Sequence, residues 1–189
     1  MIALVFAALL AAPRAPRAAP QPSRPAQAPQ TLSDAELRHR VDTYLNVLDR
    51  PIPAARWQEI GERAAPLLEA VIANQNEFPS RRAMAVDALA AAAPARARQL
   101  LGKVARDEAQ PSVVRVAAVH GAAGLLDRDQ AVQELGPVLR GARSAGMRAE
   151  AADVLSQKGA GCAEVRDQAA REKLEHRAAF DRSLKRCRE

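Results

Sequence analysis

Acidic residues and a histidine occupy one position of a pattern that recurs along the sequence. Asp87, His120 and Asp153 are separated by 120 minus 87 and 153 minus 120, which is 33 residues both times. The position three residues earlier recurs with the same step and holds Met84, Ala117 and Glu150. Carboxylate and imidazole groups bind metal ions and also pair with basic groups of a partner protein. These residues are therefore the candidate binding residues of the chain.

A metal ion is the first chemistry to consider for this column. Helices that pack side by side lie about 8 to 10 Å apart, whereas each ligand of one small ion lies within about 2.0 to 2.2 Å of it. Residues on three successive helices do not readily share one ion, so we expect neither a metal site nor a cofactor. We interpret the column as an acidic stripe for a basic protein partner. An ordinary solvated helix face is the alternative.

Serines at the start of three helical stretches, Ser80, Ser112 and Ser144, are further candidates for chemistry. A serine nucleophile needs an adjacent base, and the sequence offers none that is recognisable. Serine is also a preferred N-cap residue, so we expect these hydroxyl groups to cap helices. The sequence predicts no catalytic residues and no small-molecule substrate.

Arginines form a second column with the same period. Arg82, Arg115 and Arg148 are separated by 115 minus 82 and 148 minus 115, again 33 residues. The small residues that share their helix face recur in step and are Ala85, Ala118 and Ala151. That phase places the arginines on the packing side, where we expect them to cap carbonyl groups of the preceding turn, although they could also bind phosphate or carboxylate. The period itself is typical of a stacked helical repeat.

The composition determines the class of fold. The chain has 189 residues, of which only 3% are aromatic, so its core must be built from Ala, Leu and Val. These residues suit closely packed helices and leave a strand-rich fold little to use. We predict an all-α fold, with a repeat domain over residues 31–161 and a C-terminal helical cap over residues 162–189.

Capping and proline signals place the first helices. Ser33 followed by Glu36 is a capping box, which predicts a helix from that point. A second helix is expected to begin near Ala54, because the prolines before it are tolerated in a first turn. Its apolar pattern continues in phase across Pro66, so we expect a kink there and not a break.

Two segments precede the repeat domain. Residues 2–12 form an uncharged apolar run of about the length of a signal-peptide core, so residues 1–12 resemble a signal peptide. This run is shorter than the ~20 residues that span a bilayer. Residues 13–30 are rich in Pro, Ala and Arg and are expected to form a semi-extended linker. We expect export to the periplasm or extracellular space and no transmembrane span in the mature chain; a buried apolar helix is the alternative.

The positive charge raises the question of nucleic acid. The net charge is +6 and the pI is about 10.1, but much of this charge lies in the linker and in the C-terminal tail. Arginines that simply keep the surface soluble account for the positive charge, and an exported protein rarely meets nucleic acid. We therefore expect another protein, not nucleic acid, as the partner.

The two cysteines, Cys162 and Cys187, are predicted to form a disulfide, because an exported chain favours pairing. An unbroken helix between them would hold them about 37 Å apart, so the tail must fold back as a helical hairpin near residues 172–176. One long helix with two free thiols is the alternative.

The helix pairs over about residues 54–158, each ending in a second helix of the form x-x-R-x-x-A-x-x-x-L, resemble HEAT repeats of the short kind also seen in phycobilisome lyase-like proteins. The resemblance implies a short right-handed α-α solenoid of about three helix pairs, with an N-terminal helix and a C-terminal helical hairpin cap. It also implies that the acidic stripe lies on the concave surface. The acidic residue that such repeats often place before the arginine is present only as Asp107.

These observations favour a non-enzymatic protein-interaction scaffold of the cell envelope, which binds a partner on the concave face of the repeat. Two alternatives stay open: a HEAT-type nucleic-acid-binding or DNA glycosylase-like enzyme, and a lyase-like subunit that presents a chromophore or cofactor. The single tryptophan, Trp57, is little support for a pocket that holds a flipped base.

Overall fold

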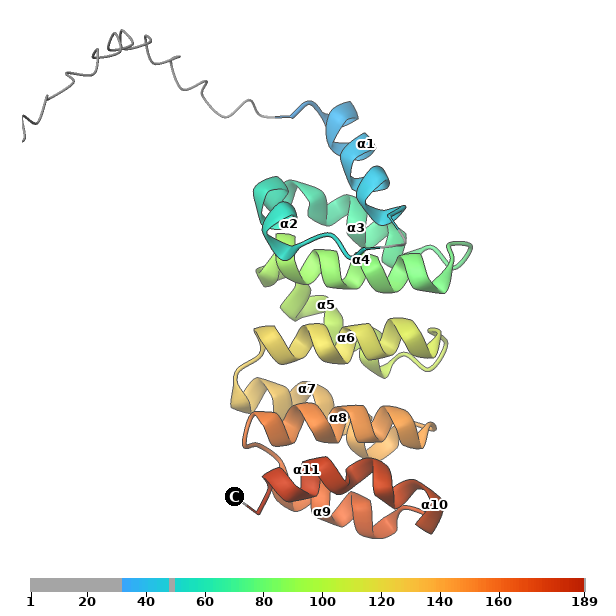
Figure 1. Cartoon of the computed structure of the whole chain (residues 1–189), viewed down its shortest axis with the longest axis vertical. Helices are drawn as coiled ribbons and strands as arrows, with labels where there is room; N and C mark the ends of the chain where they lie inside the picture. Colours follow the sequence, from blue (N-terminus) through green and yellow to red (C-terminus); the bar gives the residue numbers. More distant parts are fainter. Residues whose placement is uncertain (1–31, 48–49, 189) are drawn as a thin grey trace, which may run out of the picture. The chain divides into compact units, whose positions relative to one another are not determined.

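The computed structural model describes residues 32–47 and 50–188, and every regular element in these residues is a helix (Figure 1). The predicted all-α class is therefore confirmed for the described part of the chain. The predictions for the apolar segment 1–12 and the linker 13–30 lie outside the described residues. Among the described helices, none is both long and apolar enough to cross a membrane.

The first helix, α1 (Asp34–Leu45), begins where the capping box predicts. The Ser33 backbone N–H donates to Glu36 Oε2 at 2.8 Å, and the Glu36 N–H donates to Ser33 Oγ at 3.3 Å. The helix buries Leu37, Val41 and Leu45 against its neighbours. These residues are spaced four apart, so they lie on one face of the helix.

The next helical segment breaks at a glycine and not at a proline. It consists of α2 (Ala54–Ile60), a short 3₁₀ turn over Gly61–Ala64, and α3 (Ala65–Ala73). Gly61 ends α2 with φ of 68°, a left-handed conformation that glycine adopts without steric cost. Pro66 lies in the first turn of α3, where no N–H partner is needed. The expectation of a kink at Pro66 was wrong for this reason.

Five further helices continue the chain: α4 (Pro79–Ala92), α5 (Pro94–Arg106), α6 (Ser112–Leu125), α7 (Arg128–Gly141) and α8 (Ala145–Gln157). The predicted serine caps are correct only for Ser144, whose Oγ accepts from the Met147 N–H at 3.4 Å. Phe78 and Pro111 occupy the N-cap positions of α4 and α6, without a side-chain hydrogen bond. Ser80 thus lies inside α4, because Pro79 already occupies the first position of that helix. Ser112 is the first residue of α6, because Pro111 occupies the N-cap position.

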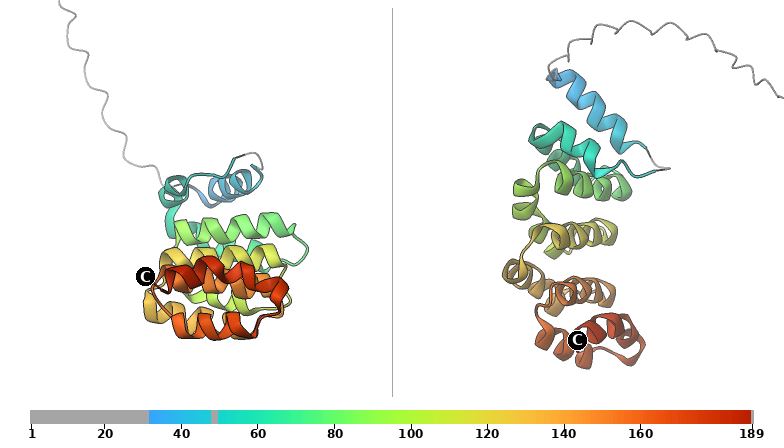
Figure 2. Two further views of the ribbon diagram at one scale, coloured as in Figure 1. Left: turned by 60° about the horizontal axis from the view of Figure 1, so that its bottom comes forward. Right: turned by 60° about the vertical axis from the view of Figure 1, so that its left-hand side comes forward.

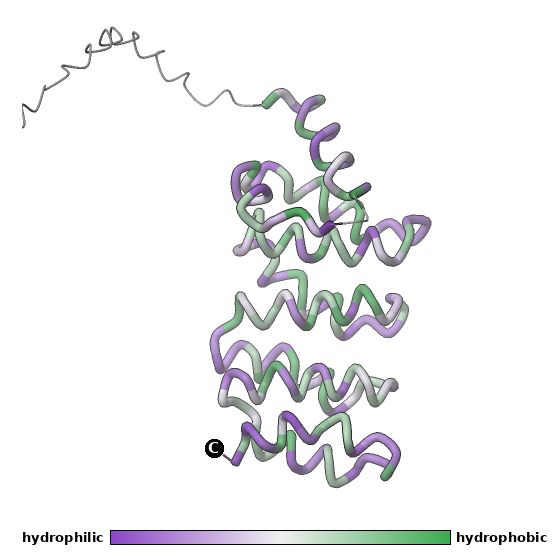
Figure 3. The backbone as a smooth tube through the Cα atoms, viewed as in Figure 1, coloured by the Kyte–Doolittle hydropathy of each residue, from purple (hydrophilic) through white to green (hydrophobic). Residues whose placement is uncertain are grey.

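The helices fall into two rows. Figures 1 and 2 show α4, α6 and α8 side by side, with α3, α5 and α7 in a second row. In the first row α6 packs against α4 and α8 packs against α6, and each of the three helices also packs against the helix before it in sequence. Ala85, Ala118 and Ala151 are fully buried between these helices, which confirms the predicted helical phase. In Figure 3, polar and apolar residues alternate along these helices, as expected for elements that bury one face.

The C-terminal region folds back on itself, as predicted. It contains α9 (Cys162–Arg171), α10 (Leu174–Arg177), a 3₁₀ turn over Ala178–Phe180, and α11 (Asp181–Arg186), which packs against α8 and α9. Cys162 and Cys187 form a disulfide, with their Cα atoms 5.4 Å apart. Phe180 is fully buried, so the reversal also closes the end of the core.

Candidate binding face

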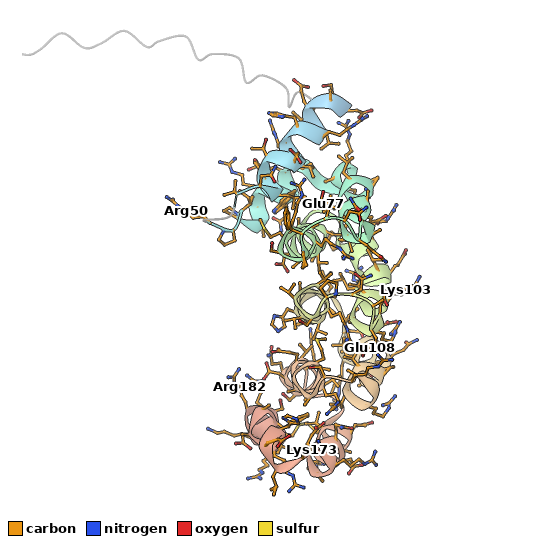
Figure 4. All side chains as sticks on the ribbon, turned by 90° about the vertical axis from the view of Figure 1, so that its right-hand side faces the viewer. Arg50, Glu77, Lys103, Glu108, Lys173 and Arg182 are labelled. Carbon is orange, nitrogen blue, oxygen red and sulfur yellow. A yellow bond between two sulfur atoms is a disulfide. The ribbon has the colours of Figure 1, made fainter. Side chains whose placement is uncertain are left out.

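The predicted candidate residues lie along one side of the α4, α6 and α8 row, which we call the binding face. Each helix contributes two of them: Met84 and Asp87 from α4, Ala117 and His120 from α6, Glu150 and Asp153 from α8. Asp87 and His120 are exposed, and the other residues are half-buried. Figure 4 shows Arg50 and Arg182 projecting on this side beyond the two ends of the row.

An internal contact engages the polar side chains in the middle of the binding face. His120 Nε2 lies 2.8 Å from Glu150 Oε2, which joins α6 to α8. The side chain of His120 is 56% exposed and that of Glu150 39% exposed, so solvent screens this pair. A partner that approaches here meets a polar contact that is already satisfied.

Asp153 is also engaged within the chain. Arg186 Nη1 of α11 donates to Asp153 Oδ1 at 2.5 Å, and Gln157 Nε2 donates to the other carboxylate oxygen at 2.6 Å. The carboxylate thus holds the C-terminal cap against α8. The structure therefore brings the candidate residues onto one face, but it leaves Asp87 as their one carboxylate without an ion pair in the described part of the chain.

Asp87 borders a pocket that the sequence did not reveal. The pocket has a volume of ≈ 160 Å³ and lies between α4, the end of α1 and the start of α2. Its mainly apolar lining includes Tyr44, Ile52, Trp57, Met84 and Ala91. The rings of Tyr44 and Trp57 pack edge to face, with centroids 5.3 Å apart. The sequence signal for this pocket is the only tryptophan of the chain, four residues after Pro53 of the Pro-Ile-Pro segment 51–53.

The apolar surroundings change the electrostatics of Asp87. Burial raises the pKa of its carboxyl group above the ordinary value, and the charge of nearby His120 partly opposes this shift. Asp87 forms no ion pair with an Arg or Lys of the described residues, so a basic group of a partner that approaches this partly desolvated carboxylate would stabilise its ionised form.

The arginine column has the structural role that its phase predicts. Arg82 Nε donates to the Ile72 carbonyl at 2.9 Å, and Arg115 Nε donates to the Ala105 carbonyl at 3.0 Å. In the third copy, Arg148 Nη1 donates to the Ala142 carbonyl at 2.5 Å. Each arginine therefore satisfies a carbonyl group of the preceding helix end or turn, which otherwise lacks an intrahelical partner.

The same arginines reach polar partners that differ between the copies. Arg82 donates to the side-chain oxygen of Gln110. Arg115 donates to both carboxylate oxygens of Glu108, at 2.8 and 2.7 Å, and this contact lowers the pKa of Glu108. Arg148 makes an equivalent bidentate pair with Glu172.

Asp107 was the one acidic residue expected before an arginine. Its carboxylate accepts instead from the Gln110 side chain and the Ala109 N–H, and these bonds lower its pKa. It thus shapes the turn before α6 and positions the amide that Arg82 contacts.

No cluster of three or more His, Cys, Asp or Glu side chains suited to a metal ion occurs within residues 32–47 and 50–188. No protein-family model, curated protein or solved structure matches the chain.

Proposed function

We propose that the protein is an exported, non-enzymatic interaction scaffold built as a short right-handed α-solenoid of HEAT-like helix pairs. The solenoid is supported by the two rows of helices and by the arginine column, which repeats one contact at three successive helix pairs. Export is supported by the disulfide, because such bonds persist in oxidising compartments. A set of rigid helices presents a surface with little ordering cost on its own side.

The observation that carries the proposal is the pocket beside Asp87. A half-buried aromatic and aliphatic pocket with an unpaired carboxylate at its edge accepts two groups at once, an apolar side chain and a cation. The partner that fits is a protein segment in which an apolar residue lies next to a Lys or Arg. The apolar residue would enter between Ile52 and Met84, and the cation would pair with Asp87.

Only one end of the face contributes strongly to this recognition. Glu150 and Asp153 are already held by His120 and Arg186, so a partner gains less from them. They position the remainder of the segment along α6 and α8. The energetic centre of the interface is therefore expected at the α2 and α4 end, as is usual for a buried anchor surrounded by weaker contacts.

Selection from a displayed random peptide library on the oxidised full-length protein tests the proposal. We expect enriched peptides to share an aliphatic or aromatic residue adjacent to Lys or Arg. Trp57 is the only tryptophan and lines the pocket, so binding of a tryptophan-free peptide should change the intrinsic fluorescence. Asp87→Asn should weaken binding about tenfold, the scale of one charge-assisted hydrogen bond.

Two further variants make the test specific. Ala91→Leu extends a side chain into the pocket and should also weaken binding. Asp167→Asn removes an exposed carboxylate of α9 and should leave the affinity unchanged. Peptides that bind Asp87→Asn and Ala91→Leu as tightly as the wild type would show that the pocket is not the binding site.

A further inference from the structure

A second pocket lies at the last step of the arginine column, away from the binding face. It has a volume of ≈ 340 Å³ and is bounded by the turn before α8, the end of α9 and the start of α10. The charged and titratable residues that line it are Arg143, Arg148, Arg171, Glu172, Lys173 and His176. Four permanent cations therefore surround a single carboxylate.

That carboxylate is fully occupied by its own neighbours. Glu172 Oε1 accepts from Arg148 Nε at 2.5 Å and from Gln168 Nε2 at 2.8 Å, and Oε2 accepts from Arg148 Nη2 at 2.6 Å. The side chain of Glu172 is only 2% exposed. The Arg148–Glu172 pair is thus neutral as a unit, and Glu172 does not neutralise the other cations of the pocket.

Three cations remain without a counter-charge. Arg143, Arg171 and Lys173 form no ion pair within the described ranges 32–47 and 50–188. Two other acidic groups lie near these cations. Glu175 lies 3.5 Å from His176. Glu108 Oε1 accepts from the Arg143 backbone N–H at 3.3 Å, but both oxygens of Glu108 pair with the Arg115 guanidinium. Arg177, the other nearby cation, donates to the backbone carbonyl of Glu172 at 3.0 Å. The mutual repulsion of the three free cations is relieved when an anion binds between them.

The positive charge occurs only at the last of the three repeated turns, the turn before α8. Stepping back by 33 residues from Arg143 leads to Gln110 and then to Glu77. Figure 4 shows Glu77, Glu108 and Lys173 on the side of the unit that faces the viewer. The turns before α4 and α6 are therefore acidic or neutral, and only the turn before α8 combines with the C-terminal cap to form a basic pocket.

We propose that this pocket binds an anion of the phosphate class. Guanidinium groups present paired N–H donors that match the spacing of phosphate oxygens, and Lys173 adds a point charge. The first residue of α8, Ala145, also lines the pocket, so the positive end of this helix dipole adds to the potential. The volume of ≈ 340 Å³ leaves room beside one phosphate group, so a larger phosphate compound fits, either a soluble molecule or a lipid headgroup.

Titration of the oxidised full-length protein with pyrophosphate and, separately, with vesicles containing a phosphatidic acid fraction tests this proposal. Isothermal calorimetry gives the stoichiometry for pyrophosphate, and co-sedimentation gives vesicle binding. We expect saturable binding of one pyrophosphate per chain at constant ionic strength. Binding to vesicles alone would identify the lipid headgroup as the ligand, whereas binding to pyrophosphate alone would identify a soluble phosphate compound.

A pair of charge-matched variants separates a site from general attraction. Arg171→Gln with Lys173→Gln removes two pocket cations, and Arg182→Gln with Lys185→Gln removes two exposed cations of α11. The first pair should weaken binding at least about tenfold, and the second less than twofold, because only the first removes charge-assisted contacts. Equal loss in both pairs, or no binding of either probe by the wild type, would overturn the proposal. Circular dichroism confirms that the variants are folded.

Discussion

Arg148 and Glu172 form a bidentate ion pair that connects α8 to the turn after α9, with N–O distances of 2.5 and 2.6 Å. The side chains are 16% and 2% exposed, respectively. Arg148 also donates to the Ala142 carbonyl, so one guanidinium joins the turn before α8, the body of α8 and the C-terminal cap. The last helix pair is thus held to the cap by polar contacts as well as by the buried Phe180.

The ion pair makes stability depend on pH in a defined direction. The Arg148 guanidinium lowers the pKa of Glu172 from 4.5 to about 2. Because the folded pKa is below the unfolded one, the stabilisation is fully present above pH ~4.5 and is lost as the pH falls towards about 2. The whole shift corresponds to about 3 kcal/mol, and the partial exposure of the Arg148 side chain reduces the expected effect to about 1 to 2 kcal/mol.

Urea unfolding of wild type and Glu172→Gln at several pH values between 7 and 3 measures this contribution. We expect the variant to be about 1 to 2 kcal/mol less stable at pH 7 and the difference to shrink below pH 4.5. Glu175→Gln, which changes an exposed carboxylate of α10, serves as the control. A difference that does not depend on pH would mean that packing, not charge, explains the effect.

Arg115 provides a prediction for the arginine column. Its side chain is 5% exposed, and it donates to the Ala105 carbonyl and to both oxygens of Glu108. A lysine cannot reproduce this planar set of bonds, so Arg115→Lys should reduce the free energy of unfolding by about 2 kcal/mol. The exposed Arg128→Lys should change it by less than about 0.5 kcal/mol. Chemical denaturation measures both, and comparable small effects would show that charge alone is sufficient at position 115.

The sequence predicted these contacts only in part. The period and phase located the arginines on the packing side, because a 33-residue step conserves the helix face. It did not identify Gln110 and Glu172 as partners, since these side chains come from a turn and from the cap, whose positions depend on the tertiary fold. The serine caps failed because a proline precedes each serine: Pro79 is the first residue of α4, ahead of Ser80, and Pro111 takes the N-cap position of α6, ahead of Ser112.

The candidate binding face was also predicted only in part from the sequence. Helical spacing placed Asp87 and Asp153 on one side of successive helices. It did not show that Arg186 reaches Asp153, because α11 returns to α8 only through the hairpin. The pocket beside Asp87 is formed where α1, α2 and α4 meet, and no periodic signal in one helix indicates such a junction.

Asp87 should reduce the stability of the free protein. Since burial raises its pKa, the ionised carboxylate disfavours the folded state above that pKa, and stability increases as the pH falls through it. Asp87 is exposed, so solvent screens part of this effect, and Asp87→Asn should raise the melting temperature at pH 7 by less than about 2 °C, while Asp167→Asn should leave it unchanged. Differential scanning calorimetry at pH 7 and pH 4 measures this. A lower melting temperature for Asp87→Asn would indicate an intramolecular partner for the carboxylate.

Two neighbouring alanines of α6 test the packing of the row. Ala118 is fully buried between α4 and α8, whereas Ala117 is half-buried on the binding face. Ala118→Arg places an unpaired charge in the core and should unfold the domain, a loss of more than about 4 kcal/mol. Ala117→Arg should cost less than about 1 kcal/mol, because its charged end reaches solvent. Thermal unfolding followed by circular dichroism distinguishes them, and equal melting temperatures would contradict the packing of α6.

The disulfide between Cys162 and Cys187 should stabilise the whole described unit, because it closes the cap over the last helix pair. The cysteines are 25 residues apart in sequence, and closing a loop of this size removes unfolded-state entropy equivalent to about 3 kcal/mol. Replacing both cysteines by alanine should lower the free energy of unfolding by about this amount. A reducing agent should destabilise the wild type equally and leave the double variant unaffected. Mass spectrometry of alkylated, non-reduced protein checks the bond, and two reactive thiols in exported material would show that the cap is not covalently closed.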